Sequence, residues 1–228
     1  ALDMGLVNKV VPFDQLEDVQ YFEDELHAAV MAAEDAGTYV MVHVYVPEAI
    51  RRAIRAGVKS IEHGQLIDEP TMKLIAEKGV WLSMQPFIGE GNNHYTNPVQ
   101  QAKHELVVQG TDRAYQLAKK YGVKLAWGTD LLFSPANARN QNLNIEKMTR
   151  WFSNFEILKM ITHDNAELLA LSGRRNPYPG KLGVIEEGAL ADLIVVDGNA
   201  LEDIKVLTDP GKNMLLIMKD GKIYKNDL

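Results

Sequence analysis

The chain has 228 residues, of which 46% are hydrophobic and 24% are charged, and its formal net charge is −7. This composition predicts a globular protein with a core large enough for one or two domains. The acidic balance argues against a nucleic-acid partner or an anionic membrane surface, and no apolar stretch is long enough to span a bilayer. Because the chain has no cysteine, disulfides and thiolate metal ligands are excluded. The compartment stays open, with the cytoplasm favoured over the periplasm.

A repeating unit runs from about residue 22 to residue 172. Four times, a segment with helical periodicity ends at a glycine, and an apolar run follows at once. Helix starts agree with this reading, since Pro47 suits a first helical turn and Asp68 suits an N-cap. The unit predicts an alternation of helices and parallel strands, with strands at Tyr39–Val44, Val58–Glu62, Val80–Ser83 and Lys124–Trp127.

Two polar loops interrupt this pattern. The first runs from Gln85 to about His104, and the second from Leu131 to Asn144. Loops at the carboxyl ends of such strands carry substrate contacts, so His94 in the first loop is a candidate substrate-binding residue.

After Gly173 the pattern changes to short antiparallel strands. The sequence predicts strands at Leu182–Gly188, Ala191–Asp197 and Met214–Asn226, the last folded into a hairpin at Asp220-Gly221. These segments predict a small β-sandwich piece that follows the helix–strand units.

Three ligand-type residues stand where apolar runs end, namely His43, His63 and Asp130. Strand ends meet at one edge of a parallel sheet, and two imidazoles with a carboxylate suit a divalent metal that activates water. A lone strand histidine is more often a core residue, but three ligand types at three strand ends favour a metal site. Glu62 is expected to face the helices, because adjacent strand residues point to opposite sides.

Four stretches resemble the amidohydrolase superfamily, and most closely its imidazolonepropionase-like and prolidase-like dipeptidase branch. They are VHVYVPEAIRRAIRAGVKSIEHG (42–64), GTDLLF (128–133), NAELLALSG (165–173) and GKLGVIEEGALADLIVVDGN (180–199). The resemblance implies a TIM-type barrel followed by a β-sandwich, one or two divalent ions such as zinc, and hydrolysis of an amide or cyclic amide by a metal-activated water. It implies metal ligation by His43, His63 and Asp130, with Asp130 also the proton acceptor. Tyr45 would hold the substrate, or simply form a pocket wall.

The family pattern is incomplete in this sequence. No His-x-His pair is present, and a full barrel takes roughly 250 residues. The resemblance therefore implies barrel strands five to eight in residues 19–173, with a β-sandwich portion in 174–228. Residues 1–18 resemble instead, weakly, a segment of enoyl-CoA hydratase-like (crotonase) enzymes.

Two functions follow from this reading. The first is a metal-dependent hydrolase of a dipeptide or another small amide, completed by an amino-terminal half that associates with this chain. The second is an inactive half-barrel whose unpaired sheet edges drive homo-oligomerisation, since natural proteins rarely leave such edges uncovered. Metal content together with solution mass separates the two hypotheses.

Overall fold

The computed structural model describes residues 19, 21–89, 97–131 and 138–228. Contacts group the chain into two compact units, Ala1–Lys124 and Leu125–Leu228. The predicted domains at 19–173 and 174–228 come from the family resemblance and stay a prediction. The segment at 1–18 and the loop residue His94 lie outside the described residues.

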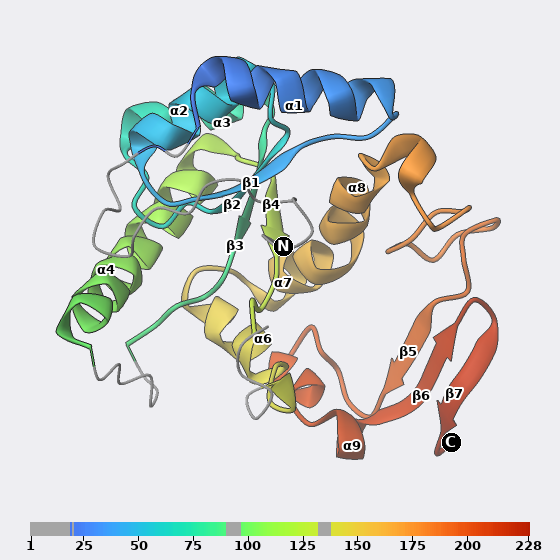
Figure 1. Ribbon diagram of the computed structural model, residues 1–228. Helices are drawn as coiled ribbons and strands as arrows, with labels where there is room; N and C mark the ends of the chain where they lie inside the picture. Colours follow the sequence, from blue (N-terminus) through green and yellow to red (C-terminus); the bar gives the residue numbers. More distant parts are fainter. Residues whose placement is uncertain (1–18, 20, 90–96, 132–137) are drawn as a thin grey trace. The chain divides into compact units, whose positions relative to one another are not determined.

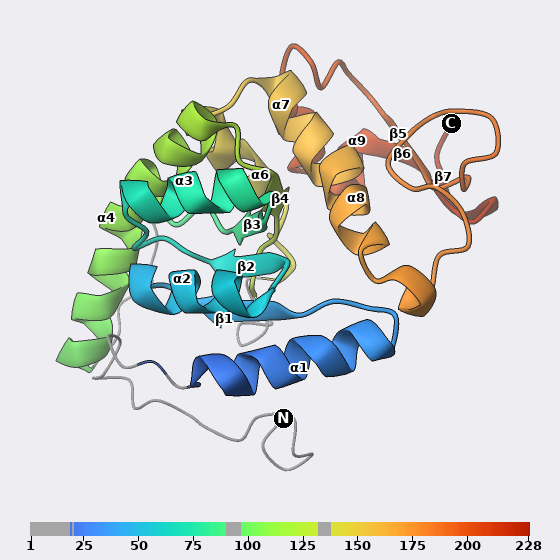
Figure 2. The same cartoon turned by 90° about the horizontal axis from the view of Figure 1, so that it is seen from above.

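The first unit alternates helices with parallel strands. Strand β1 pairs with β2, and β2 pairs with β3, both in parallel, which confirms the predicted arrangement of these three strands. The helices form an outer layer beside the strands, and each contacts the next along the chain (Figures 1 and 2). The elements are α1 (Glu23–Asp35), β1 (Met41–Val44), α2 (Pro47–Ala56), β2 (Ser60–His63), α3 (Glu69–Lys78), β3 (Trp81–Met84) and α4 (Pro98–Tyr121).

Local sequence explains where these helices begin and end. Proline stands in the first turn of α2, α3 and α4, where its missing N–H costs no hydrogen bond. The Asp68 side chain caps α3 by accepting a hydrogen bond from the Thr71 N–H. Helices α2, α3 and α4 each end at a left-handed glycine, as the sequence predicted.

The core of this unit lies between the helices and the strands. Ile50 on α2 is fully buried, as is Ile75 on α3. From the sheet, Ile61 and Leu82 are also inaccessible to solvent. Burial of such side chains contributes about 1.5–3 kcal/mol each, so the central strands are held firmly, and with them the residues that follow their carboxyl ends.

The second unit contains helical segments and an antiparallel sheet in the order β5-β6-β7. Asp220 and Gly221 both have positive φ, at 48° and 72°, and form the predicted hairpin turn between β6 and β7. Helices α7 and α8 join through a π-helical turn into one rod (Figure 2). The elements are β4 (Leu125–Trp127), α6 (Leu143–Lys147), η1 (Met148–Arg150), α7 (Asn154–Lys159), η2 (Met160–Asp164), α8 (Asn165–Ala170), η3 (Gly173–Arg175), β5 (Leu193–Val196), η4 (Ile204–Leu207), α9 (Pro210–Asn213), β6 (Met214–Lys219) and β7 (Lys222–Asn226).

The prediction of a strand at Leu182–Gly188 was wrong. This segment is irregular, and Ile185 within it is 92% exposed. Gly183 and Gly188 both have positive φ, which turns the backbone away from an extended path. The backbone bonds locally instead, with Leu190 N–H donating to the Lys181 carbonyl.

The architecture is therefore α/β, with a parallel sheet and a separate small antiparallel sheet. None of the described helices combines the length and the apolar character that crossing a membrane requires.

Candidate metal-binding site

The carboxyl ends of β1 and β2 bring two of the predicted ligands together. His43 Nδ1 lies 2.8 Å from His63 Nε2, and the two ring centroids are 5.0 Å apart. His63 is 4% exposed, whereas His43 is exposed, so one side of the pair is open to solvent. Both facing nitrogens can donate a lone pair to the same ion when they carry no proton.

The two rings meet because His63 leaves the strand conformation. In the β1–β2 ladder His43 is paired with Glu62, and paired residues of parallel strands project to the same face. His63 would then point to the other face, but its φ is +82°, a value uncommon outside glycine. This left-handed residue redirects the ring toward His43.

The expectation that Glu62 faces the helices was therefore wrong. The pairing places it on the His43 face of the sheet. Its carboxylate accepts a hydrogen bond of 2.6 Å from the Ser60 hydroxyl. Burial, and then the charge of Glu62, raise the pKa of Tyr39 above its usual 10.

The loop after β2 is anchored from two sides. Gly64 N–H donates to the Val44 carbonyl at 2.9 Å, so the sheet pairing continues one residue past His63. On the other side, Arg113 of α4 donates to the Ile67 carbonyl at 2.6 Å. The Gln65 carbonyl packs so closely on Gly110 that a Cβ at this glycine would lie 2.2 Å from the oxygen. These contacts fix the backbone that carries His63.

Two glutamines complete a buried polar cluster around His63. Gln85, directly after β3, places Oε1 2.8 Å from His63 Nδ1. Gln65 Nε2 donates to the same oxygen at 3.4 Å. Gln65 Oε1 is buried and has no hydrogen-bond partner in the described part of the chain. Sequence reasoning missed both glutamines, although Gln85 directly follows β3 and Gln65 lies two residues after the end of β2.

Tyr45 lies against His63 as a stacked ring. The centroids are 4.6 Å apart and the planes differ by 5°. This geometry suits an aromatic wall that limits rotation of the His63 ring. Whether Tyr45 also holds substrate stays a prediction.

Asp130 belongs to the second unit and follows β4. Its φ is +51°, so among described residues outside glycine it shares a positive φ only with His63 and Asp220. The chain three residues before it is held by Asn165 of α8, which accepts from the Trp127 N–H at 2.9 Å and donates to the Trp127 carbonyl at 3.0 Å. Strained backbone of this kind concentrates at functional sites. The convergence of Asp130 with the two histidines stays a prediction.

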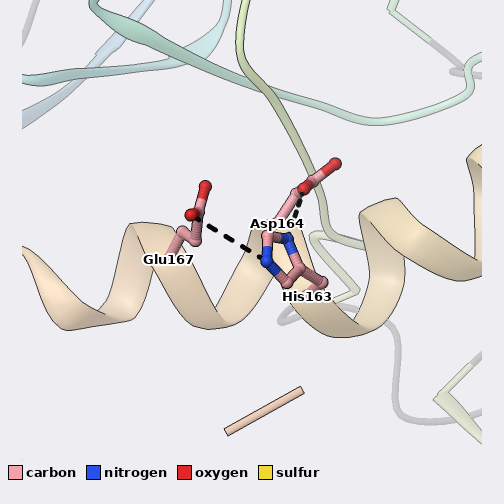
Figure 3. Close-up of side chains that lie close together, drawn as sticks. All are labelled: His163, Asp164 and Glu167. Carbon is pink, nitrogen blue, oxygen red and sulfur yellow. Dashed lines mark hydrogen bonds and ion pairs between the residues drawn. The ribbon is translucent and has the colours of Figure 1, made fainter. Parts of the chain in front are cut away.

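A second group of potential metal ligands lies on the rod of α7, η2 and α8 (Figure 3). Ligand atoms of His163, Asp164 and Glu167 lie within 4.8 Å of one another. His163 Nδ1 is 2.9 Å from Asp164 Oδ1, and its Nε2 is 3.9 Å from Glu167 Oε1. Lys159 forms an ion pair with Asp164 as well. Lys159 on the same helical rod therefore already compensates the charge of the Asp164 carboxylate, as expected for a surface ion pair.

The two sites differ in chemistry. The His43–His63 pair is supported by a buried amide network, lies at strand ends and is partly open to solvent. Such a donor set suits zinc, which binds imidazole nitrogen and in catalytic sites keeps one position for water or substrate.

This chain belongs to the amidohydrolase family. The profile of that family matches residues 7–224, so the match includes part of the segment for which a crotonase resemblance was noted.

The proteins that this chain resembles include an ochratoxinase, a prolidase and a dipeptidase. The chain is 32% identical over 210 residues to ochratoxinase from Aspergillus niger, covering 90% of this chain and 42% of that protein. It resembles the structure of a prolidase complexed with N-methylphosphonate-L-proline (36% identity, TM-score 0.80, covering 91% of this chain and 50% of that one). It also resembles a Xaa-Pro dipeptidase with methionine bound in its active site (32% identity, TM-score 0.76, covering 91% and 50%). The chain thus spans about half the length of these relatives.

Proposed function

We propose that this chain supplies the carboxyl-terminal half of a metal-dependent amidohydrolase that cleaves the C–N bond of a dipeptide or a cyclic amide. In this proposal its parallel strands are barrel strands five to eight, and its antiparallel sheet is part of a β-sandwich. The observation that carries the proposal is the 2.8 Å contact between His43 and His63 at neighbouring strand ends, in an amidohydrolase-family chain that resembles a prolidase and a Xaa-Pro dipeptidase.

The proposed metal ligands and the proton acceptor are three separate side chains. His43 Nδ1 and His63 Nε2 would hold a divalent ion, zinc in the first instance, because imidazole nitrogen is a preferred zinc ligand. One or two ions would be bound in the completed enzyme. A bound ion supplies Lewis acidity and makes water a better nucleophile at neutral pH. Asp130 would complete the ligand set and accept the proton of the attacking water on a carboxylate oxygen.

In this proposal Tyr45 and His94 bind the substrate. The Tyr45 hydroxyl would hold a substrate carboxylate or carbonyl by hydrogen bonding, while its ring keeps His63 in place. His94 would contact substrate from the loop after β3. A small amide or dipeptide is the partner favoured by the relatives, and neither nucleic acid nor a membrane surface is expected at the acidic charge of −7.

A zinc titration of the purified chain tests the proposed ligands. We expect weak zinc binding by calorimetry, because only part of the family's ligand set is present, and loss of that binding in His43→Gln and His63→Gln. His27→Gln is the control, because His27 is exposed on α1 and should not affect zinc. Equal zinc binding by all four proteins would contradict the assignment.

Turnover is tested in the same proteins with dipeptide and cyclic amide substrates. The chain alone should hydrolyse these substrates slowly, and adding the amino-terminal half of a related amidohydrolase should raise the rate of hydrolysis. In that complex Asp130→Asn should abolish turnover while much of the zinc stays bound, since the lost group is the proton acceptor. Brisk turnover by the isolated chain would show that the ligand set is wrongly assigned.

The second candidate function is an inactive fragment that self-associates. Strand β1 lies at the edge of the parallel sheet, and its Met41 is 50% exposed. An edge strand with exposed apolar side chains can pair with another chain, which favours self-association. A stable oligomer without zinc and without turnover, even after addition of an amino-terminal half, would support this second function.

A further inference from the structure

We propose that Gln85 is a positioning residue that fixes the tautomer of His63, and that Gln65 holds Gln85 in place. The inference rests on the metal-ligand role proposed for His63. In this arrangement the His63 proton stays on Nδ1, and the Nε2 lone pair is directed toward the metal position before any ion arrives.

The geometry of the cluster leaves little freedom. His63, Gln85 and Gln65 are 4%, 5% and 0% exposed, so water cannot readily replace their hydrogen bonds. His63 Nδ1 lies 2.8 Å from Gln85 Oε1. The Tyr45 ring stacked on His63 resists a flip of the imidazole that would exchange its two nitrogens.

The chemistry of the amide then assigns the protons. A carbonyl oxygen only accepts hydrogen bonds, so His63 Nδ1 must carry the proton. Gln65 Nε2 donates to the same oxygen at 3.4 Å, and in this orientation of the two amides Gln85 Oε1 is the acceptor. A neutral imidazole has one ring proton, so His63 Nε2 is the acceptor in its 2.8 Å contact and His43 Nδ1 is the donor.

The two histidines are therefore not equivalent. His63 is already in the form that a metal ligand requires. His43 must move its ring proton from Nδ1 to Nε2, or lose it, before Nδ1 can bind an ion. Hydrogen-bond partners of metal-ligating histidines commonly change metal affinity by roughly 10- to 100-fold. An amide carbonyl in this position would orient His63 without adding a negative charge.

The direct test is the tautomeric state of His63 in the metal-free chain, measured by long-range nitrogen–proton NMR with the rings neutral. In the unmodified chain we expect the proton on Nδ1. Gln85→Leu removes the acceptor and should shift His63 toward the Nε2–H form, whereas Gln85→Glu keeps an acceptor and should retain the Nδ1–H form. Ser83→Ala, a buried polar position on the same strand, is the control and should change neither.

The second readout is zinc affinity by competition with a chelating dye. Gln85→Leu should weaken zinc binding by roughly 10- to 100-fold, with Gln85→Glu and Ser83→Ala close to the unmodified chain. If Gln85→Leu does not fold by circular dichroism, Gln65→Met replaces it, because Gln85 then loses its donor and the Nε2–H population of His63 should rise.

The outcomes separate this inference from the proposed function. An Nε2–H tautomer of His63 in the unmodified chain, or an unchanged tautomer in Gln85→Leu, would overturn the role of Gln85 whatever the zinc result. Absence of zinc binding by the unmodified chain, together with the expected tautomers, would overturn the metal site and leave the Gln85–His63 arrangement as a structural feature.

Discussion

Single residues in this chain combine structural and electrostatic roles, and Asp68 shows both. Its carboxylate caps α3 through the Thr71 N–H at 2.9 Å and lies 3.3 Å from a guanidinium nitrogen of Arg51. Burial acts to raise the pKa of Asp68, but the hydrogen bonds from Thr71 and the charge of Arg51 outweigh it and hold that pKa below its usual 3.8. The folded protein therefore favours the ionised form of this side chain.

The consequence is a pH-dependent contribution to stability. Asp68→Ala should lower the free energy of unfolding by about 1 kcal/mol at neutral pH, a typical loss for an N-cap. Asp68→Asn keeps a capping oxygen and isolates the effect of charge. Folding lowers the pKa of Asp68. The stabilisation that its charge provides, and that Asp68→Asn removes, should therefore be complete above pH 3.8 and should vanish as the pH falls through the pKa of Asp68 in the folded protein. Urea unfolding across this range measures it, and a difference that persists at the lowest pH would refute the charge effect.

At the scale of elements, helix α4 positions the loop that carries the candidate site. A glycine inside a helix normally costs about 1 kcal/mol relative to alanine, so Gly110 requires a reason. The reason is the Gln65 carbonyl, which approaches within 2.2 Å of where a Cβ would stand. Arg113, one helical turn further on, bonds the carbonyl of Ile67 in the same loop. Close packing of α4 thus fixes the path from His63 to Ile67.

Gly110→Ala should therefore destabilise the protein, against the usual propensity, by an amount typical of overpacking, about 1–3 kcal/mol. It should also weaken zinc binding, because the displaced loop carries His63 and Gln65. Gln109→Ala on the exposed side of the same helix is the control and should change stability by less than about 0.5 kcal/mol. A stabilised Gly110→Ala protein would show that the loop relaxes without cost.

At the scale of the whole molecule, the chain exposes apolar side chains on both of its sheets. It spans 42% of ochratoxinase and about half of the prolidase and dipeptidase chains. On the antiparallel sheet, Ile194, Ile223 and Tyr224 are exposed. On the parallel sheet, Met41 lies on the edge strand β1. Exposed edges of this kind favour association with another chain.

We accordingly expect the isolated chain to form oligomers, measured by light scattering as a mass that rises with concentration. Met41→Lys places a charge at the edge of β1 and should lower that mass. Met31→Lys is the matched control, because Met31 is similarly exposed, at 46% against 50% for Met41, but lies on helix α1. Addition of an amino-terminal half should replace the oligomer by a complex of defined mass. A monomer at every concentration would contradict the expectation.

The sequence by itself determined what depends on neighbours along the chain. Helix ends at glycines, the Asp68 cap, the parallel strands of the first unit and the Asp220-Gly221 hairpin all follow from local backbone preferences and apolar periodicity. The family was predicted from sequence motifs, and the profile match to residues 7–224 confirms it. Periodicity alone failed at Leu182–Gly188, where two glycines with positive φ bend an apolar segment out of any strand.

Only the tertiary structure decided how side chains meet across elements. Strict alternation would separate His63 from His43, and their contact depends on a left-handed backbone at His63 that no local rule predicts. Gln85 reaches His63 from 22 residues away, and Gly110 meets Gln65 across a helix–loop contact. Such contacts depend on how separate elements pack, and packing is set by the shapes of all the side chains between them. Local sequence therefore fixed the positions of the strand ends, while the arrangement of donors at those ends was fixed by the fold.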